Sequence, residues 1–273
     1  MIYTAQDRII GSNFYPNGLF RPKAPMGGSA PPAVWAPTDK SGLLFWFKTD
    51  AGVTESGGLV SAWADQSGNG RDASQSSGAL QPTYTAGVLN SKPGISFPSG
   101  TYLNFGTDVL FDVTGTFSLV IVTKDTVEGG TYYHTACSVF TNEDSNSVFS
   151  LLFSNDTNYG DGCYAAMNGT PGAMVKVPGD FSTNAVSFLM NYVGGLPTVI
   201  TSYSSYRNNV ALTQSVAGPS AVGQNQNRLG CWWDGSLNLV GSIFEIFAYD
   251  TSVSSGEAAS IQSYVSSAAR WAI

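Results

Sequence analysis

The sequence predicts an all-β protein: a two-sheet antiparallel β-sandwich with an extended N-terminal arm and one C-terminal amphipathic helix. The main observation is a series of short segments rich in aromatic and β-branched residues. They recur at intervals of roughly 8–15 residues, separated by clusters of Gly, Pro, Asn or Asp, which is the spacing of a sandwich. The composition agrees, since 31 of the 273 residues are glycine and 12% are aromatic, a mixture that suits strands joined by tight turns.

Residues 1–41 are expected to form an extended docking arm. Six of the 13 prolines lie there, and proline fixes φ and removes a backbone donor, which disfavours both sheet and helix. A polar linker would lack large apolar residues, whereas this segment contains aromatic anchors. The arm is therefore expected to pack either on its own sandwich or on a partner subunit. The expected anchors are Phe14, Tyr15, Phe20 and Trp35.

Residues 42–273 are expected to form the sandwich. The run from Trp63 to Asp72 ends an apolar strand and turns through Gly68 and Gly70, which indicates a corner between strands. The expected strands are Leu43–Phe47, Leu59–Trp63, Gly94–Phe97, Tyr102–Phe105, Phe117–Thr123, Ser138–Phe140, Val148–Phe153, Tyr164–Met167, Ala185–Tyr192, Thr198–Tyr203, Val210–Gln214, Arg228–Trp232 and Leu239–Tyr249.

A single helix is predicted over residues 255–271. Ser254 and Glu257 have the spacing of a capping box, in which each side chain accepts a hydrogen bond from the other residue's backbone amide. Apolar residues then follow at helical spacing and make one face. This helix is expected to lie across the sandwich and close its core. The residues of the apolar face are Ile261, Tyr264, Val265, Ala268 and Trp271.

Three blocks of sequence resemble the concanavalin A-like lectin/glucanase superfamily in its laminin-G-like form. They are Leu43–Phe47 with Trp63–Ser74, Gln81–Tyr84 with Asn90–Phe97, and Gly241–Asp250 with Ser254–Glu257. The resemblance covers residues 42–273 and implies a jelly-roll sandwich. It implies no single activity, because lectins, glycosidases and adhesion modules share this fold. Similar domains are common in bacteriophage virion proteins, so a capsid decoration or tail protein is the implied setting.

The sequence offers no catalytic group of a familiar kind. Retaining glycosidases need two carboxyl groups about 5 Å apart, and no two of the five glutamates lie within five residues of each other. Glu245 and Asp250 are expected to share a strand, but their opposite parity places them on opposite faces. His134 is the only histidine and has no nucleophile motif beside it. We therefore expect a non-enzymatic protein.

No cofactor is expected, although calcium is an alternative at one loop. Asp65, Ser67 and Asn69 alternate before Gly70, as oxygen ligands do at the start of an EF-hand loop, but Ser76 stands where the bidentate Glu would be. The other interpretation is a turn in which these side chains bond to local backbone, and the incomplete spacing favours it. Similar oxygen-rich loops occur at 142–146 and 156–161.

Two aromatic clusters are candidates for carbohydrate contact, because sugar rings stack on aromatic faces while their hydroxyls pair with polar groups. Neighbouring residues of a strand point to opposite faces, so one tryptophan of an adjacent pair is expected in the core. The other is expected to be a binding platform or an interface residue. The clusters are Tyr132, Tyr133 and His134, and Trp232, Trp233 and Asp234.

The net charge and the hydropathy pattern disfavour two classes of partner, nucleic acids and membranes. A net charge of −7 without a basic cluster disfavours nucleic acid, and no apolar run reaches the ~18 residues of a membrane span. The first residues lack a signal peptide, so synthesis in the host cytoplasm is expected. Only 11% of residues are charged, and we expect neighbouring subunits to cover much of the surface, as in a homo-oligomer.

The chain has three cysteines, Cys137, Cys163 and Cys231. They are expected to be either three free thiols or one disulfide and one free thiol.

Together these observations predict a non-enzymatic bacteriophage protein on the virion surface. It would be a decoration or adhesion module that its N-terminal arm docks to capsid or tail subunits. The alternative is a lectin-like module that binds host surface polysaccharide.

Overall fold

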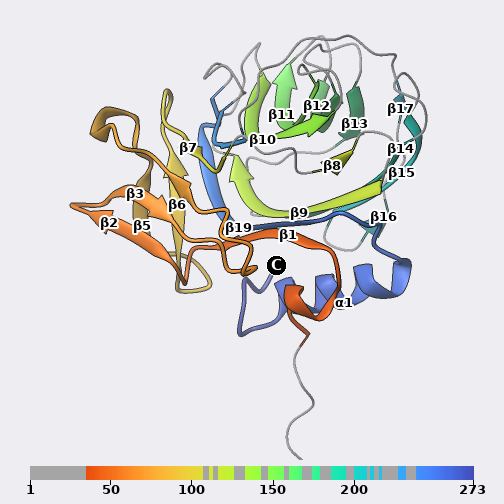
Figure 1. Ribbon diagram of the computed structural model, residues 1–273, viewed down its shortest axis with the longest axis horizontal. Helices are drawn as coiled ribbons and strands as arrows, with labels where there is room; N and C mark the ends of the chain where they lie inside the picture. The colour runs from red at the N-terminus through yellow and green to blue at the C-terminus, as the bar shows by residue number, and fades with distance from the viewer. Residues whose placement is uncertain are drawn as a thin grey trace, which may run out of the picture. The chain divides into compact units, whose positions relative to one another are not determined.

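The protein is mostly β, with a strongly curled sheet and one α-helix at its C-terminal end (Figure 1). The computed structural model describes residues 35–106, 111–112, 116–125, 133–142, 147–156, 160–167, 174–178, 186–194, 200–207, 210–211, 215–216, 227–231 and 238–273. Side chains are described at 35–106, 116–124, 227–231 and 238–273, and at Ser187 and Leu189. Within these ranges the pairing is antiparallel except between β8 and β10. The predicted all-β class is confirmed at this level.

The strands before residue 130 are β1 (Leu43–Lys48), β2 (Val53–Ser56), β3 (Leu59–Trp63), β4 (Ala73–Ser74), β5 (Thr83–Leu89), β6 (Lys92–Phe97), β7 (Leu103–Asn104), β8 (Phe111–Asp112) and β9 (Thr116–Asp125). The later strands are β10 (Tyr133–Asn142), β11 (Ser147–Asp156), β12 (Gly160–Met167), β13 (Met174–Pro178), β14 (Val186–Gly194), β15 (Ile200–Arg207), β16 (Val210–Ala211), β17 (Ser215–Val216), β18 (Arg228–Leu229) and β19 (Gly241–Tyr249). Two short 3₁₀ turns, η1 (Pro37–Asp39) and η2 (Gly78–Leu80), and the helix α1 (Ser255–Ser266) complete the described elements.

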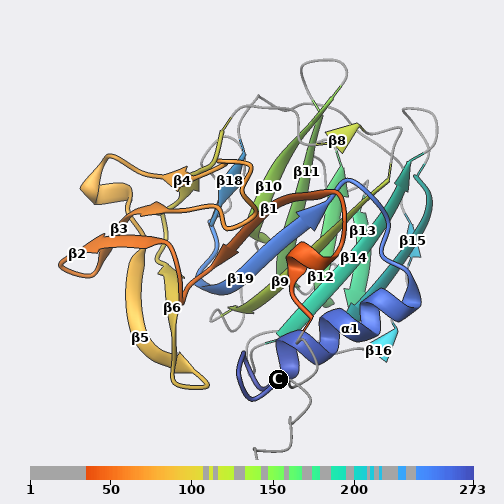
Figure 2. The same cartoon turned by 60° about the horizontal axis from the view of Figure 1, so that its bottom comes forward.

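Strand β19 is central to the described core. All nine of its residues are buried, as expected of a strand covered on both faces. It pairs with β9 along one edge and with β6 and then β1 along the other. Figure 2 shows β1, β19, β9 and β14 side by side, with α1 lying across them. This arrangement gives β19 one face toward the helix and one toward the interior.

The interior face is packed with aromatic rings. The ring of Phe47 lies 5.4 Å from that of Trp63 and 5.5 Å from that of Phe105, and Phe45 lies 5.1 Å from Phe105. All four side chains are at most 1% exposed. Ring pairs at these separations stabilise a core beyond simple burial. Trp63, which marks the predicted corner, is thus a core residue.

Helix α1 starts at the predicted capping box. The Ser254 hydroxyl accepts a hydrogen bond from the Glu257 amide at 3.3 Å, and the Glu257 carboxylate accepts one from the Ser254 amide at 2.8 Å. Its buried face consists of Ala258, Ile261, Tyr264 and Val265. Among the described residues no helix is long and apolar enough to cross a membrane.

The predicted end of the helix is wrong. The helix stops at Ser266, and Ala268 is exposed although the helical pattern placed it on the apolar face. The amide and hydroxyl of Ser267 both donate to the carbonyl of Tyr264, which ends the helical ladder. The chain then turns, and Trp271 reaches the core through irregular backbone.

Strands β2, β4, β5, β8, β13 and β17 were absent from the sequence prediction, and at β2 and β5 the burial explains why. β2 and β5 are mostly exposed, so they lack the alternation of apolar and polar residues that marks a half-buried strand.

The compact unit of the fold begins at Trp35. The residues from 35 to 42, which we call the root segment, lie against α1 and the end of β19. The Trp35 ring meets the edge of the Tyr264 ring at 5.6 Å, and the Tyr249 hydroxyl donates to the Pro37 carbonyl at 2.9 Å. Lys40 forms a 3.0 Å ion pair with Glu257. Trp35 therefore packs on its own domain, whereas the expected anchors Phe14, Tyr15 and Phe20 lie outside the described residues.

Candidate functional site

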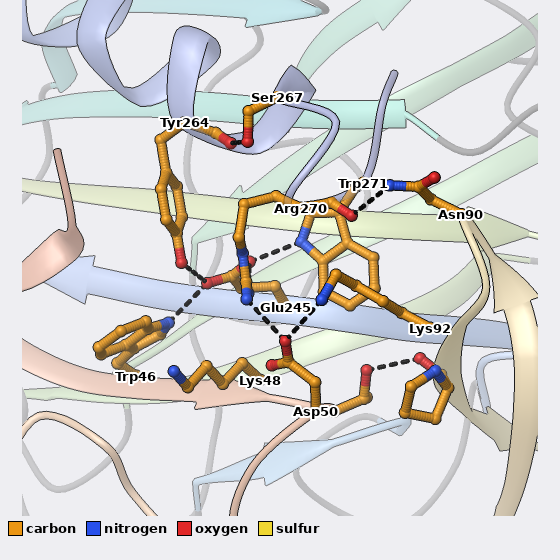
Figure 3. A network of polar contacts seen from close by, with 12 residues as sticks. Trp46, Lys48, Asp50, Asn90, Lys92, Glu245, Tyr264, Ser267, Arg270 and Trp271 are labelled. Carbon is orange, nitrogen blue, oxygen red and sulfur yellow. Dashed lines mark hydrogen bonds and ion pairs between the residues drawn. The ribbon is translucent and has the colours of Figure 1, made fainter. Parts of the chain in front are cut away.

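The most concentrated polar chemistry in the described part of the chain surrounds Glu245, in the middle of β19 (Figure 3). Its carboxylate is completely buried and accepts four hydrogen bonds. Oε1 accepts from Trp46 Nε1 at 2.6 Å and from the Tyr264 hydroxyl at 2.8 Å. Oε2 accepts from the Arg270 guanidinium and from Trp271 Nε1, both at 2.6 Å. These four donors come from β1, from α1 and from the turn after α1.

A second layer surrounds the Arg270 guanidinium. Asp50 Oδ2 accepts from Arg270 at 2.8 Å and from Lys92 Nζ at 3.0 Å, and the Asn90 side-chain amide donates to the carbonyls of Ala268 and Arg270. Burial acts to raise the pKa of Asp50, but the Lys92 hydrogen bond and the nearby cations outweigh it and hold that pKa below its usual value. We call these residues, with Glu245 and its four donors, the Glu245 network.

The Glu245 network holds the chain end on the sheet. Both carboxylate oxygens of Glu245 already accept two protein donors each, so this carboxylate has no free position from which to take a proton from a substrate. Burial, and then the Glu245 charge, raise the pKa of the Tyr264 hydroxyl, which keeps it a neutral donor. The network thus joins α1, the following turn, β1 and β19 in one satisfied cluster, as a buried charge requires.

One sequence signal could have located this network. Glu245 is the single charged residue in the otherwise uncharged run Gly241–Tyr249. A charge inside a fully buried strand is almost always paired. The same reasoning could not have named the partners, since they lie between 19 and 199 residues away in sequence.

The loop at Asp65 has the geometry of the turn interpretation. Asp65 Oδ1 accepts from the amides of Trp46 and Ser67, both at 2.9 Å. Its Oδ2 accepts from the Ser67 hydroxyl at 2.7 Å and from the Arg71 amide at 3.1 Å. The side-chain amide of Asn69 donates to the backbone carbonyls of Leu43 and Leu44 in β1. These hydrogen bonds attach the loop to β1. In the described ranges no group of three His, Cys, Asp or Glu side chains is placed to hold a metal.

A row of polar residues crosses the part of the sheet formed by β4, β7, β18, β10 and β11. The register aligns Ser74 of β4, Asn104 of β7, Arg228 of β18, Ser138 of β10 and Ser150 of β11. Directly paired residues share one face of an antiparallel sheet. The next register positions, Leu103 and Leu229, are fully buried, so that opposite face is core. We call the aligned set the polar row.

Contacts between side chains fix the centre of the polar row. Arg228 Nε donates to Asn104 Oδ1 at 2.9 Å, and the Arg228 guanidinium lies 4.6 Å from the centre of the Tyr102 ring. The guanidinium, the amide and the aromatic ring are therefore held together. Sequence analysis missed this group because its members belong to strands more than 120 residues apart.

Two of the residues predicted to contact carbohydrate, Tyr133 and His134, lie in the described part of the chain. The register pairs Tyr133 with Ser154 and His134 with Phe153, which puts these neighbours on opposite faces of β10. Ser154 and Ser150 are four positions apart on β11 and therefore lie on the same face of the sheet. Because Tyr133 pairs with Ser154, it lies on the face of the polar row. His134 lies on the opposite face. Tyr132, Trp232, Trp233 and Asp234 lie outside the described residues. Cys231 is a buried free thiol, and the side chains of Cys137 and Cys163 are not among those described.

No protein-family model and no curated protein matches this sequence. Several solved structures resemble its fold. The sialidase of Trypanosoma rangeli in complex with the inhibitor DANA has a TM-score of 0.53 and 12% identity over 82% of this chain. The binding domain of Paraclostridial Mosquitocidal Protein 1 has a TM-score of 0.55 and 11% identity over 83%. An arabinofuranosidase complexed with arabinofuranosyl-alpha-1,2-xylobiose has a TM-score of 0.53 and 16% identity over 85%.

This chain spans only part of each of those proteins: 33% of the sialidase, 52% of the mosquitocidal binding domain and 60% of the arabinofuranosidase. At identities this low the likeness concerns the fold alone. The chain thus shares a β-rich, curled antiparallel architecture with parts of a sialidase, an arabinofuranosidase and the binding domain of a mosquitocidal protein.

Proposed function

We propose that this protein is a non-enzymatic carbohydrate-binding module of the concanavalin A-like type, and that its curled sheet closes as a two-layered jelly roll. The observation that carries the proposal is the polar row, in which hydroxyl, amide and guanidinium groups stand across neighbouring strands beside the Tyr102 ring. Sugar recognition uses the same combination, with an aromatic surface under the ring and polar groups around its hydroxyls.

Two further points support this assignment. The fold resembles domains of two carbohydrate-active enzymes. Tyr133, selected from the sequence as a sugar contact, belongs by register to the face of the polar row. In this proposal Tyr102 and Tyr133 are the aromatic contacts on the sheet, and Asn104 contacts the sugar hydroxyls. Arg228, which is buried, holds Asn104 and the Tyr102 ring in position. The second aromatic cluster, at residues 232–234, is proposed to contribute a further sugar contact.

The test is a glycan array followed by titration calorimetry with the best ligand. Tyr102→Ala should weaken binding about tenfold or more, because stacking on an aromatic ring is lost. Thr85→Ala, at an exposed position of β5, is the matched control and should bind normally. Trp232→Ala and Trp233→Ala test the second aromatic cluster. Absence of glycan binding, or full binding by Tyr102→Ala, would refute the proposal, and turnover of a polysaccharide would refute its non-enzymatic part.

The virion-surface role stays a prediction. It rests on the low charge and on the proline-rich N-terminal residues, with their aromatic anchors Phe14, Tyr15 and Phe20. It is compatible with carbohydrate binding, since a virion adhesion module acts by contacting polysaccharide on the host surface. In that setting the partners are capsid or tail subunits on one side and a host glycan on the other.

A further inference from the structure

Strand β1 pairs with β19 along one edge, and the loop of residues 64–72, which we call the Asp65 loop, covers its other edge. On that edge the backbone amide of Trp46 donates to Asp65 Oδ1 at 2.9 Å. The Trp46 carbonyl accepts from the backbone amide of Gln66 at 2.7 Å. The Asp65 loop therefore stands where a further strand would pair, and a covered edge is protected from unwanted strand pairing.

Asn69 covers the beginning of the same edge. Its side-chain NH₂ group donates to the Leu43 carbonyl at 2.7 Å and to the Leu44 carbonyl at 3.0 Å. Arg71 also donates to the Leu44 carbonyl, at 2.8 Å. Both hydrogen bonds of Asn69 depend on its amide nitrogen, because a carboxylate in this position can only accept.

The residues around Asn69 favour the loss of that nitrogen. No other part of the chain lies within 4 Å of the position that a Cβ would take at Gly70, so the backbone nitrogen of Gly70 is sterically unhindered beside the Asn69 side chain. Gly68, Asn69 and Gly70 are all exposed, and opening a loop tip that buries little costs little free energy. Of the three asparagines that precede a glycine, Asn69 is the one among the described residues, and the others are Asn17 and Asn168.

We propose that Asn69 is a site of spontaneous deamidation, and that its conversion uncovers this edge of β1. The Gly70 nitrogen attacks Asn69 Cγ to form a cyclic imide, while the Cγ–Nδ2 bond breaks and ammonia leaves with the proton of the Gly70 amide. Water then opens the imide at either of its carbonyls, which yields aspartate or isoaspartate. The new carboxylate has no proton to donate to the Leu43 and Leu44 carbonyls, and its charge is repelled by them, so the loop tip no longer binds β1. The inference is independent of the proposed sugar binding.

Peptide mapping of the folded wild-type protein after long incubation in neutral buffer tests the reaction. Asn90 is the matched internal control, because its exposed side-chain amide also donates to two backbone carbonyls, those of Ala268 and Arg270, but is followed by Ser91. Asn69 should convert to aspartate and isoaspartate several-fold faster than Asn90. Conversion of Asn69 at the rate of Asn90 or more slowly would overturn the proposal.

Hydrogen exchange tests the structural consequence in Asn69→Asp and in the incubated wild-type protein. The backbone amide of Trp46 lies on the covered edge and should exchange several-fold faster in Asn69→Asp, because the loop opens more often. The incubated protein should show this acceleration in its converted fraction. The amides of Phe45 and Phe47 are the control, since alternation along the strand turns them toward β19, and their exchange should not change. Unchanged exchange at Trp46, or equal acceleration of all three amides, would show that Asn69 does not protect this edge.

Discussion

At the scale of single residues, Glu245 determines how the end of the chain is held. Its carboxylate is buried, paired with Arg270, and surrounded by hydrogen-bond donors. Such a group contributes little net stability while it is paired, but removing its charge leaves the partner unpaired in the core. The network is therefore a better determinant of geometry than of overall stability.

Glu245→Gln is expected to reduce the free energy of unfolding by about 3–5 kcal/mol. The amide keeps the shape of the carboxylate, but its NH₂ group must face two donors, and Arg270 loses its buried counter-charge. Denaturant unfolding measures the change. Glu55→Gln, at an exposed carboxylate that accepts one backbone amide, is the control and should change stability by less than about 0.5 kcal/mol. Equal effects of the two variants would show that the Glu245 charge is not needed.

Glu257 gives the fold a defined response to acid. Hydrogen bonds from the backbone and hydroxyl of Ser254, and then one from Lys40, lower the pKa of its carboxyl from 4.5 to about 2. A depressed pKa contributes stability that is complete above the unfolded value and is lost as pH falls through the folded value.

The difference in melting temperature between the wild-type protein and Glu257→Gln should therefore be constant at neutral pH. It should then shrink as pH falls from 4.5 to about 2, because the wild-type carboxylate becomes protonated. Thermal melts over a pH series measure it. A difference that does not change across this interval would show that the carboxylate charge does not stabilise the helix start.

At the scale of elements, the root segment and the turn after α1 hold the helix from two sides. Trp35, Pro37 and Lys40 contact Tyr264, Tyr249 and Glu257 from outside the sheet. The Glu245 network holds the turn after the helix from the sheet side. The helix is thus fixed between the segment that precedes β1 and the strand that precedes the helix.

Two truncations separate the root segment from the residues before it. Deleting residues 1–34 should leave the stability of the compact unit unchanged, whereas deleting 1–40 should reduce it by roughly 1–3 kcal/mol, because the Tyr249 hydroxyl and the Tyr264 ring lose their partners. Denaturant unfolding of both proteins measures the difference. If the virion prediction is right, the shorter deletion yields a folded protein that no longer joins particles, and normal incorporation of that protein would contradict the prediction.

At the scale of the whole molecule, the sequence was sufficient to predict a mostly β protein with one C-terminal helix and insufficient to predict the site. The β class was predicted from apolar strands such as β1 and β19, because a buried strand is a short, mostly apolar segment that can be recognised in the sequence. The Asp65 turn and the helix start were also predictable, because their hydrogen bonds join residues a few positions apart. The end of α1 was not, since Trp271 continues the helical spacing while its indole is drawn to Glu245.

Sites that join distant strands leave no such local pattern. Tyr102 and Asn104 meet Arg228 only because β7 and β18 are neighbours in the sheet. The exposed strands β2 and β5 were missed for a related reason, since a strand with little burial has no apolar alternation. Sequence analysis therefore described the buried half of the molecule better than its exposed strands and the surface proposed to bind carbohydrate.

The Glu245 network has a consequence for how this chain folds. Trp46 and Glu245 are 199 residues apart, and Arg270 and Asp50 are 220 apart. Contacts over such separations slow folding, because a long loop must close before they form. On the ribosome, the aromatic strand Leu43–Lys48 is synthesised before β19 and before the residues that follow α1. It stays uncovered until β19 pairs with it. A nascent chain of this protein thus exposes Trp46 while the 199 residues up to Glu245 are synthesised, and during that time aggregation competes with folding.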